Sequence, residues 1–509
     1  MTKSFDWIAH HATARPDNVA MHDLATDRTF TWREMEDRTS RLAAAFEHDF
    51  GVSAGDRVMV IAHNNTNFFE VQFACWKLGA IFVPVNWRLT LSELTFIATD
   101  CGPDVIVHDR EFADMSRDLA EAANIAHRID WESNDDGAAD YESAIAAADP
   151  GNYTPGDNTL DTVLTIMYTS GTTGLPKGAQ ITQGMTFYNA INCVEFYSLH
   201  SNMTNLAFLP LFHTGGLNVF ANPCFHFGGR NIVMRTFDPA EALRLLTDPD
   251  VGVTHFIGVP ANFLFMSQVP EFESAEFPTI EGASVGGSPT PVPLIEAWGA
   301  KGMALQQAFG MTETSPLVCA LKPEDCEVKI GSAGLAAMHT AVRVVDEDGN
   351  DLGRNETGEL WVKGPNVTPG YWNRPEANAE SFTDGWLHTG DAAVIDDEGF
   401  IYIVDRWKDM YISGGENVYP AEVENVIYEL PAVGEVAIIG VPDEKWVEVG
   451  RAIVVVKEGE SIDEATIINH CREHLARFKV PQSVVFIDEI PHNATGKVLK
   501  RVLRDTYSE

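Results

Sequence analysis

Basic residues are scarce in this chain of 509 residues. Lys and Arg together number 35 against 74 Asp and Glu, which gives a formal net charge of −39. Proteins that bind nucleic acid or anionic membranes non-specifically rely on clusters of cationic side chains. The charge balance therefore argues against both kinds of partner. A site for an anionic nucleotide must then be built locally, from backbone N–H groups, helix N-termini and a few cations.

Long apolar runs and paired cysteines are also missing. No run approaches the roughly 20 apolar residues that span a bilayer, and the N-terminus lacks the apolar core of a signal peptide. The seven cysteines form no Cys-x-x-Cys pair and are odd in number. This pattern favours buried thiols in a reducing compartment over a disulfide or zinc framework. We expect a cytoplasmic protein without stable membrane insertion.

Helical and strand patterns alternate through the N-terminal part of the chain, which is too long for one ordinary domain. Thr31 and Glu34 form a capping box that predicts the start of a helix. Arg57–Ala62 and Ile81–Val85 are predicted strands, separated by a helix at Phe69–Leu78. This succession favours the α/β class, with parallel sheets and helices in layers.

The pattern changes near residue 405. Phe400–Val404 is a predicted strand, and the chain then restarts with Asp-Arg-Trp-Lys-Asp at residues 405–409. We predict a large N-terminal domain at 1–404 and a small α+β domain at 405–509, with a hinge near 405–409.

Within the predicted small domain, a helix starts at Pro420, strands follow at Glu435–Ile439 and Ala452–Val456, and Ser461 caps another helix.

Far upstream, residues 133–158 are acidic and weakly apolar, and we interpret them as a surface excursion.

The most informative segment reads Tyr-Thr-Ser-Gly-Thr-Thr-Gly-Leu-Pro-Lys-Gly, at residues 168–178. It follows Leu160–Met167, an apolar run that predicts a buried strand. Gly171 and Gly174 permit a sharp turn that exposes backbone N–H groups, while hydroxyls and Lys177 add donors and charge. Such a concavity suits a polyphosphate. It is not the Walker pattern, because glycine follows the lysine and the glycine spacing differs.

Four further polar segments stand in apolar contexts: Pro210–Leu217, Gln307–Glu313, Trp386–Asp391 and Asn493–Lys497. In the first, the adjacent Gly215 and Gly216 make room for a ligand beside His213. Asp391 offers a carboxylate suited to a ribose diol, and Lys497 lies in a glycine turn near the C-terminus. Each segment alone also fits an ordinary turn.

Together and in this order, these segments resemble the adenylate-forming superfamily of acyl-CoA synthetases, luciferases and peptide-synthetase adenylation domains. The resemblance extends from Thr31 to Lys497. Its motifs are the phosphate loop, Phe309–Glu313, Gly390-Asp391, Asp405-Arg406 and Gly496-Lys497. It implies an α/β fold with a large N-terminal domain of layered sheets and helices and a small mobile C-terminal α+β lid. The implied reaction joins a carboxylate to ATP as an acyl-adenylate, releasing pyrophosphate, before a thiol displaces AMP.

The resemblance implies an ATP/AMP site with many members: Thr169, Ser170, Gly171, Thr172, Thr173, Gly174, Lys177, Gly287, Ser288, Gln307, Ala308, Phe309, Thr312, Asp391, Arg406 and Lys497. The glycine-rich loop would hold the β- and γ-phosphates, and Gln307 to Phe309 would border adenine. Glu313 and Thr172 would bind Mg²⁺. Thr312 would contact the α-phosphate, while Lys497 would reach the carboxylate and the α-phosphate.

The implied ribose ligands are Asp391 and Arg406, and Lys408 occupies the hinge position of the lid. His213 would gate the boundary between the acyl pocket and the thiol tunnel. The other residues implied for substrate and CoA are Gly215, Gly216, Gly310, Ser413, Gly414 and Gly415. The implied catalytic set is thus Lys497, Thr312, Glu313, His213 and Lys408.

The expected enzyme is an AMP-forming acid–thiol ligase that uses ATP, Mg²⁺ and coenzyme A, and the sequence leaves a homodimer open. No carrier domain follows Lys497, so a stand-alone ligase is favoured over a peptide-synthetase module. No cation evidently awaits a second carboxylate, so we favour a medium- or long-chain fatty acid or a similar apolar monocarboxylic acid.

Four alternatives belong to other substrate or function classes. Aryl acids of the cinnamate or ferulate type are the main alternative substrate, and an amino acid is less favoured. A protein that only binds acyl-adenylates is disfavoured by the intact Lys497. A generic ATPase or kinase is disfavoured because no Walker B or kinase catalytic-loop string accompanies the glycine-rich segment.

Overall fold

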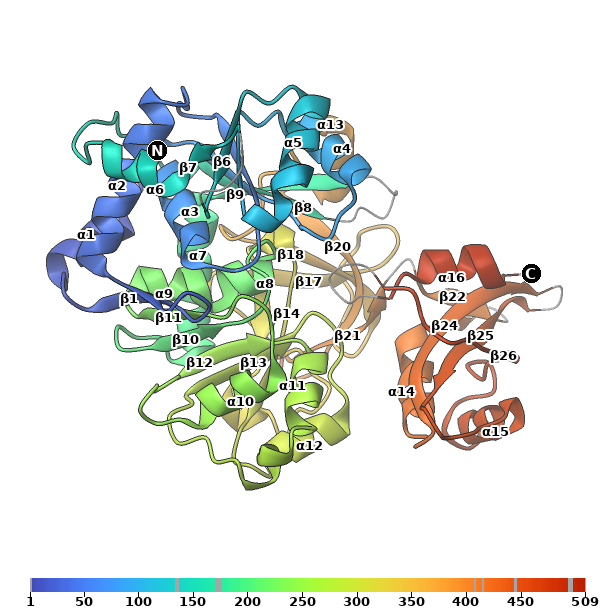
Figure 1. Ribbon diagram of the computed structural model, residues 1–509. Coiled ribbons are helices and arrows are strands. Elements are labelled where there is room, and N and C mark those ends of the chain that lie inside the picture. The colour runs from blue at the N-terminus through green and yellow to red at the C-terminus, as the bar shows by residue number, and fades with distance from the viewer. Residues whose placement is uncertain are drawn as a thin grey trace. The chain divides into compact units, whose positions relative to one another are not determined.

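The structure is a computed structural model, in which contacts divide the chain into two compact units (Figure 1). Unit 1 comprises Met1–Ala341 and Val362–Leu387, and unit 2 comprises Val342–Trp361 and His388–Glu509. The structure describes residues 2–132, 137–169, 176–406, 409–413, 416–443, 446–492 and 498–508, with the backbone alone described at 406, 412, 416, 417 and 447.

Unit 1 contains a seven-stranded sheet of order β7-β6-β5-β3-β4-β8-β9. Its strands are β3 (Arg57–Ile61), β4 (Ile81–Pro84), β5 (Val105–His108), β6 (His127–Asp130), β7 (Ala139–Asp140), β8 (Val163–Thr169) and β9 (Lys177–Thr182). All neighbours pair in parallel except β8 and β9. The parallel sheet confirms the predicted α/β class.

Both faces of this sheet are buried by helices. Val58 and Val60 of β3 belong to one hydrophobic cluster, whereas Met59 and Ile61 belong to another. Because side chains alternate along a strand, the two clusters lie on opposite faces. The helices of this region are α2 (Trp32–His48), α3 (Thr66–Leu78), α4 (Leu91–Cys101), α5 (Ala113–Ala123) and α6 (Tyr141–Ala147). Figure 1 shows α4 and α5 on one side of the strands and α2, α3 and α6 on the other.

The second sheet of unit 1 has nine strands in the order β16-β15-β14-β13-β12-β10-β11-β1-β2. Their bounds are β1 (Val19–Asp23), β2 (Arg28–Thr31), β10 (Thr204–Ala207), β11 (Arg230–Val233), β12 (His255–Gly258), β13 (Gly282–Gly286), β14 (Leu305–Gly310), β15 (Leu317–Ala320) and β16 (Leu335–Ala336). The run from β1 through β11, β10, β12 and β13 to β14 is parallel, and the remaining pairs are antiparallel.

Further helices of unit 1 are α1 (Trp7–Ala14), α7 (Gln183–Tyr197), α8 (Thr214–Gly216), α9 (Asn222–Phe227), α10 (Pro239–Thr247), α11 (Pro260–Ser267), α12 (Val292–Gly299) and α13 (Pro375–Ser381). A π-helical turn, Leu217–Ala221, joins α8 to α9. No helix in the described part of the chain combines the length and apolarity that crossing a membrane requires.

Unit 2 contains a mainly antiparallel sheet of order β23-β22-β25-β24, with β26 parallel to β25. Its elements are β22 (Tyr411–Ser413), β23 (Glu416–Val418), α14 (Pro420–Tyr428), β24 (Val433–Asp443), β25 (Val447–Val456), α15 (Glu464–His474), β26 (Ser483–Phe486) and α16 (Lys500–Tyr507). Five further strands precede the elements of this sheet in the chain: β17 (Ala341–Val345), β18 (Thr357–Lys363), β19 (Phe382–Thr383), β20 (Trp386–Ile395) and β21 (Ile401–Arg406).

The capping box at the start of α2 is confirmed. Thr31 Oγ1 accepts a hydrogen bond from the Glu34 amide at 3.3 Å, and the Glu34 carboxylate accepts one from the Thr31 amide at 2.8 Å. The helix predicted from Pro420 is confirmed as well. The seven cysteines are free and buried, as the sequence predicts.

The surface excursion predicted at 133–158 is wrong for part of that range. Residues 141–147 form α6, and the side chain of Tyr141 is fully buried. The Tyr141 hydroxyl donates to a carboxylate oxygen of Glu70 at 2.8 Å. Local composition did not reveal this packing, because the partner lies on α3.

The cap predicted at Ser461 is also wrong. Helix α15 starts at Glu464, and its cap is Asp463, whose carboxylate accepts from the Thr466 amide at 2.9 Å. Both residue types cap helices well, so composition alone did not decide between them.

The domain boundary predicted at 404/405 does not coincide with a break in secondary structure. Strand β21 extends through Asp405 to Arg406, and the division between units falls at 341/342, 361/362 and 387/388. The boundary at 405 remains a prediction about which part of the chain moves.

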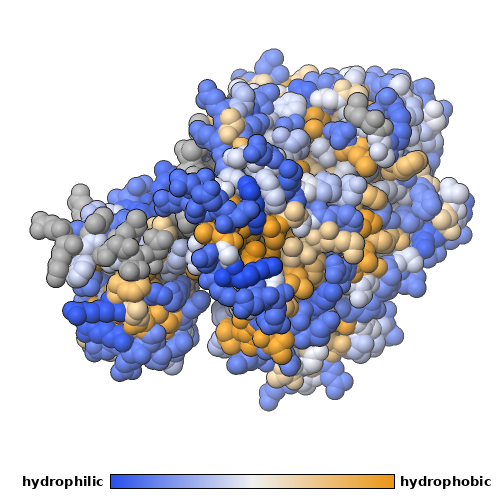
Figure 2. Space-filling model, turned by 180° about the vertical axis from the view of Figure 1, so that it is seen from behind, coloured by the Kyte–Doolittle hydropathy of each residue, from blue (hydrophilic) through white to orange (hydrophobic). Residues whose placement is uncertain are grey.

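Hydrophilic residues predominate on the face that Figure 2 shows, and apolar residues gather there in patches on unit 1.

Candidate functional site

Three of the predicted site segments follow neighbouring parallel strands of unit 1. Strands β10, β12, β13 and β14 are adjacent and parallel, so their carboxyl ends share one edge of the sheet. His213 follows β10, Gly287 and Ser288 follow β13, and Thr312 and Glu313 follow β14. Ligands of open α/β sheets bind outside the carboxyl ends of such strands.

Glu313 lies in a 3₁₀ turn, Thr312–Thr314, directly after β14, and its side chain is buried. One carboxylate oxygen, Oε1, accepts a hydrogen bond from the Tyr371 hydroxyl at 2.8 Å. The backbone oxygen of Glu313 accepts from the Thr368 amide at 2.7 Å. Among the described residues, none hydrogen-bonds to Oε2. A buried carboxylate with one oxygen available fits a hard cation such as Mg²⁺, which prefers oxygen ligands.

The segment 366–372 ties this turn to strand β9. At one end, Asn366 Nδ2 donates to the Thr314 carbonyl oxygen at 3.2 Å. At the other end, the Trp372 amide donates to the Gly178 carbonyl oxygen at 2.7 Å. The Thr312–Thr314 turn and the β8–β9 hairpin are therefore held in a fixed relation.

The β8–β9 hairpin presents Lys177 next to the same tyrosine. Thr169 pairs with Lys177 at the end of the ladder, and Thr169 Oγ1 donates to the Lys177 carbonyl oxygen at 3.4 Å. Lys177 Nζ lies 5.3 Å from the centroid of the Tyr371 ring, within the range of a cation–π contact. Five predicted phosphate-loop residues lie outside the described residues: Ser170, Gly171, Thr172, Thr173 and Gly174.

The predicted adenine-bordering residues occupy the end of β14. Ala308 pairs with Gly286 of β13, and a Cβ added to Gly286 would lie 2.9 Å from the Ala308 carbonyl oxygen. Gln307 is buried, and its Nε2 has no hydrogen-bond partner among the described residues. Phe309 is half-buried. The edge thus combines an unpaired amide donor with an aromatic ring, groups that suit a heteroaromatic base.

Two positions near this edge require glycine, one because of its backbone conformation and the other because of close packing. Gly287 has a φ of +86°, a conformation that L side chains rarely adopt. A Cβ added to Gly310 would overlap the Pro316 carbonyl oxygen across the β14–β15 turn. The assignment of Gly310 to substrate or CoA stays a prediction.

His213 caps the short helix α8. Its Nδ1 accepts a hydrogen bond from the Gly215 amide at 3.1 Å, so in this geometry the ring proton resides on Nε2. A neutral imidazole with protonated Nε2 can donate to a ligand but is not a ready base. The gating role of His213 stays a prediction.

The expectation that Gly215 and Gly216 both make room for a ligand needs correction. A Cβ on Gly216 would overlap the Pro210 carbonyl oxygen and lie 2.7 Å from that of Leu209, so backbone packing requires this glycine. A Cβ on Gly215 would meet His213 Nδ1 at 3.4 Å, an ordinary contact. Of the two glycines, Gly215 is the one with space beside it.

In unit 2, strands β20 and β21 bring two predicted ribose ligands opposite each other. Asp391 pairs with Arg406 in the antiparallel ladder, and the side chain of Asp391 is buried. The preceding Gly390 has a φ of +71°, and its amide donates to a Glu359 carboxylate oxygen at 3.0 Å. The described part of Arg406 is its backbone.

Most of the remaining predicted residues of unit 2 lie outside the described residues: Lys408, Gly414, Gly415 and Lys497. Ser413 is buried at the end of β22. Asp405, at the start of the predicted hinge, accepts from the Ala421 amide at 2.7 Å, which ties that residue to the first turn of α14.

Tyr371 and Asn366 are site residues that the sequence analysis missed. The string Pro-Gly-Tyr-Trp at 369–372 is a local signal for an ordered aromatic turn. Glu313, which accepts the hydrogen bond from Tyr371, lies 58 positions away in the chain, and no local pattern encodes that contact.

Family models and known proteins match this chain over most of its length. The family model described as "AMP-binding enzyme" matches residues 8–372, and "AMP-binding enzyme C-terminal domain" matches 422–497. The chain is 39% identical over 501 residues to a feruloyl-CoA synthase of Amycolatopsis sp, with 98% of each chain covered. It is 39% identical over 508 residues to a long-chain-fatty-acid–CoA ligase of Mycobacterium tuberculosis, with 99% of each covered.

A solved structure of another protein has the same fold as this chain. The O-succinylbenzoate coenzyme A synthetase of Bacillus subtilis, in complex with ATP and magnesium ion, superposes with a TM-score of 0.88. Its sequence is 30% identical, and the alignment covers 99% of this chain and 100% of that one.

Proposed function

This chain belongs to the family of AMP-binding enzymes and is an AMP-forming acyl-CoA synthetase, and we propose that its acid is an apolar monocarboxylic acid, with medium- and long-chain fatty acids favoured. In the first half-reaction a carboxylate oxygen attacks the α-phosphorus of ATP, and the bond to the β-phosphate oxygen breaks. In the second, the CoA sulfur attacks the acyl carbon, AMP leaves, and the thiol proton passes to solvent.

Glu313, Tyr371 and Lys177 carry the proposed site for the first half-reaction. The hydrogen bond from Tyr371 fixes the Glu313 carboxylate beside the turn that holds Thr312, and the Tyr371 ring lies next to the Lys177 ammonium. We propose that Glu313 and Thr172 hold Mg²⁺, which would neutralise phosphate charge. Phosphoryl-type transfer depends mainly on positioning and charge stabilisation, and these residues supply both.

The remaining nucleotide roles are proposals drawn from the family order of the motifs. The loop from Thr169 to Gly174 holds the β- and γ-phosphates, with Lys177 adding charge, and Thr312 contacts the α-phosphate. Gly287, Ser288, Gln307, Ala308 and Phe309 border the nucleotide.

In unit 2, we propose that Asp391 and Arg406 bind the ribose hydroxyls. Lys497 acts on the carboxylate and the α-phosphate in the first half-reaction. Residues 405–509 form the moving lid, with Lys408 in its hinge. Ser413, Gly414 and Gly415 border the path of the CoA thiol.

The proposed acid follows from the chemistry around His213. Residues 208–221 include no Asp, Glu, Lys or Arg. The Asn218 side chain is already engaged, because its Nδ2 donates to Thr214 Oγ1 at 3.2 Å and its Oδ1 accepts from Asn222 at 2.7 Å. The large apolar side chains of this stretch are buried. A segment that carries no charged side chain, and whose asparagine side chain is already hydrogen-bonded within the protein, suits an apolar acyl group.

An aryl acid of the cinnamate or ferulate type is the alternative, supported by the feruloyl-CoA synthase relative. An amino acid is less favoured, because the stretch near His213 offers no carboxylate for an ammonium group. A homodimer and a cytoplasmic location remain predictions from the sequence.

AMP release measured with CoA across C2–C18 fatty acids, benzoates and cinnamates tests the acid. The proposal expects the highest kcat/KM within the C8–C18 fatty acids. A preference for cinnamates of tenfold or more would replace the fatty-acid proposal with the aryl alternative. Formation of ADP without any acid would contradict the ligase assignment itself.

A further inference from the structure

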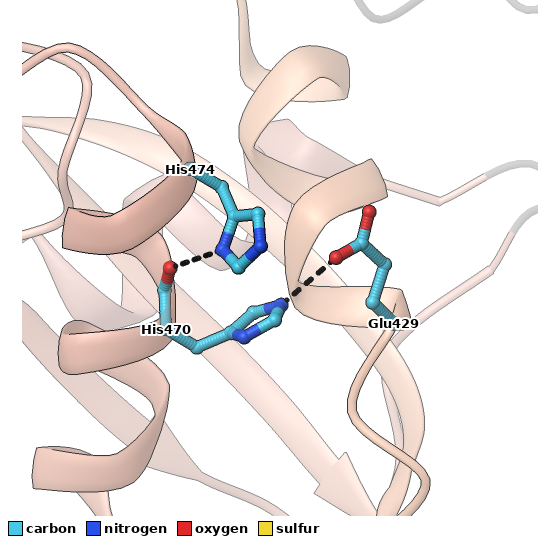
Figure 3. A group of neighbouring side chains, drawn as sticks. All are labelled: Glu429, His470 and His474. Carbon is cyan, nitrogen blue, oxygen red and sulfur yellow. Dashed lines mark hydrogen bonds and ion pairs between the residues drawn. The ribbon is translucent and has the colours of Figure 1, made fainter.

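Three potential metal ligands meet in unit 2, and none of them is a residue assigned to the adenylation chemistry. Glu429 follows the last residue of α14, and His470 and His474 lie on α15. Their ligand atoms all lie within 4.8 Å of one another. Figure 3 shows both imidazole rings projecting from one helix toward Glu429 at the end of the other. This group is the only one of its kind in the parts of the chain that the structure describes.

We propose that Glu429, His470 and His474 form a site for a divalent transition-metal ion of the Zn²⁺ class. Residues four apart on a helix lie on the same face, so α15 presents the two imidazoles as a chelating pair. Two histidines and a carboxylate are a ligand set that zinc uses in proteins, with water completing the coordination. Solvent access is available, because Glu429 and His474 are exposed.

The distances require little rearrangement. His470 Nε2 lies 3.0 Å from a Glu429 carboxylate oxygen. Ligand atoms at about 2.0–2.1 Å from a tetrahedral zinc are separated by about 3.3 Å, so this pair is already at coordination distance. The exposed Glu429 side chain closes the remaining gap to His474 by rotating about its side-chain bonds.

The tautomer of His474 is set for coordination. Its Nδ1 lies 2.9 Å from the His470 carbonyl oxygen, and a carbonyl can only accept, so Nδ1 carries the proton. The lone pair of Nε2 is therefore available to a metal. A backbone carbonyl that holds the distal nitrogen of a histidine is the usual support of such a ligand. When the metal binds His470 through Nε2, the proton that Nε2 shares with Glu429 passes to solvent and Nδ1 takes one up, so that the imidazole stays neutral.

Cys471 lies between the two histidines in sequence but is not a candidate ligand. Its side chain is fully buried in the cluster that α14 and α15 share, with Ile427 and Ile467. The metal would thus bridge the outer surface of two helices that already pack on one core, and so stabilise unit 2.

The test uses the full-length protein, freed of metal with a chelator and returned to buffer containing Mg²⁺. We expect isothermal titration with Zn²⁺ to give one site per chain, and Zn²⁺ to raise the midpoint of thermal unfolding. His474→Ala and Glu429→Gln should each weaken Zn²⁺ binding by at least about tenfold. His200→Ala is the matched control, because it removes the histidine of another exposed His–Glu pair, at 2.8 Å from Glu281, and should leave binding unchanged.

A second probe, Co²⁺, distinguishes the ligand sets by absorption. The proposed site gives weak visible d–d bands without a thiolate-to-cobalt charge-transfer band. The proposal is overturned if His474→Ala binds Zn²⁺ as the parent protein does, or if a charge-transfer band appears and is lost in Cys471→Ser. Metal-free His474→Ala should unfold at the parental temperature, because its exposed side chain supports little packing.

Discussion

The hydroxyl of Tyr371 donates a hydrogen bond to the Glu313 carboxylate at 2.8 Å, and both side chains are buried. The same tyrosine offers its ring to the Lys177 ammonium at 5.3 Å. One residue therefore touches the proposed metal-binding carboxylate and the proposed phosphate-binding lysine. Tyr371 thus connects strand β9 to the turn after β14.

Removing the Tyr371 hydroxyl should impair the first half-reaction. A hydrogen bond to a charged group contributes about 1.5–3 kcal/mol, so Tyr371→Phe should lower acid-dependent ATP–pyrophosphate exchange about ten- to hundredfold. The Mg²⁺ concentration for half-maximal exchange should rise as well. Tyr188→Phe, at a tyrosine whose ring contacts His339, is the control and should behave like the parent enzyme. Equal exchange rates in the two variants would refute the positioning role of Tyr371.

The two adjacent glycines after His213 should differ in tolerance. Gly216→Ala drives a methyl group into the carbonyl oxygens of residues 209 and 210, and we expect it to destabilise unit 1 by about 1–3 kcal/mol in urea unfolding. Gly215→Ala, which meets only an ordinary contact, is its matched control and should stay near the parental stability. If Gly215→Ala were the more damaging change, the packing explanation would be incorrect.

A buried ion-pair network holds α2 to α3. Arg38 Nε and Glu70 Oε1 lie 2.7 Å apart, and the Glu70 side chain is fully buried. Arg38→Met leaves this carboxylate without its cation, which should destabilise the fold by about 3–5 kcal/mol in denaturant unfolding. Arg33→Ala removes an exposed partner of Asp17 and should cost less than about 1 kcal/mol. A small effect at both positions would show that Glu70 is stabilised by other groups.

Stability should also respond to pH through Asp109. Desolvation raises the pKa of this carboxyl to about 7, despite Arg235 at 3.4 Å. Between about pH 4 and pH 7 the folded protein keeps a proton that the unfolded chain has lost, so this group's contribution to stability falls as pH rises.

Asp109→Asn should therefore flatten the decline in unfolding free energy across that window, by up to about 1.4 kcal/mol per pH unit. Asp250→Asn changes an exposed aspartate and serves as the control. Parallel pH profiles for Asp109→Asn and the parent protein would contradict the raised pKa.

The sequence predicted the parts of the fold and the site that are encoded locally. The alternation of strand and helix patterns predicted the parallel α/β layers, and the motif strings selected Lys177 and Glu313, which both contact Tyr371. Contacts between distant segments were not predictable in the same way. The Tyr141–Glu70 hydrogen bond, which places α6 in the core, joins residues 71 positions apart. The role of Tyr371 was not predicted for the same physical reason, because it depends on how segment 366–372 packs against β9.

The most direct test of the account measures both half-reactions of Glu313→Gln, a change that keeps the size of the side chain and removes its charge. We predict that acid-dependent ATP–pyrophosphate exchange without CoA falls by about a hundredfold or more, whereas thioester formation from a supplied acyl-adenylate and CoA stays within about twofold. An equal loss in the two half-reactions, or exchange at the parental rate, would contradict the assignment of Glu313 to the adenylation step.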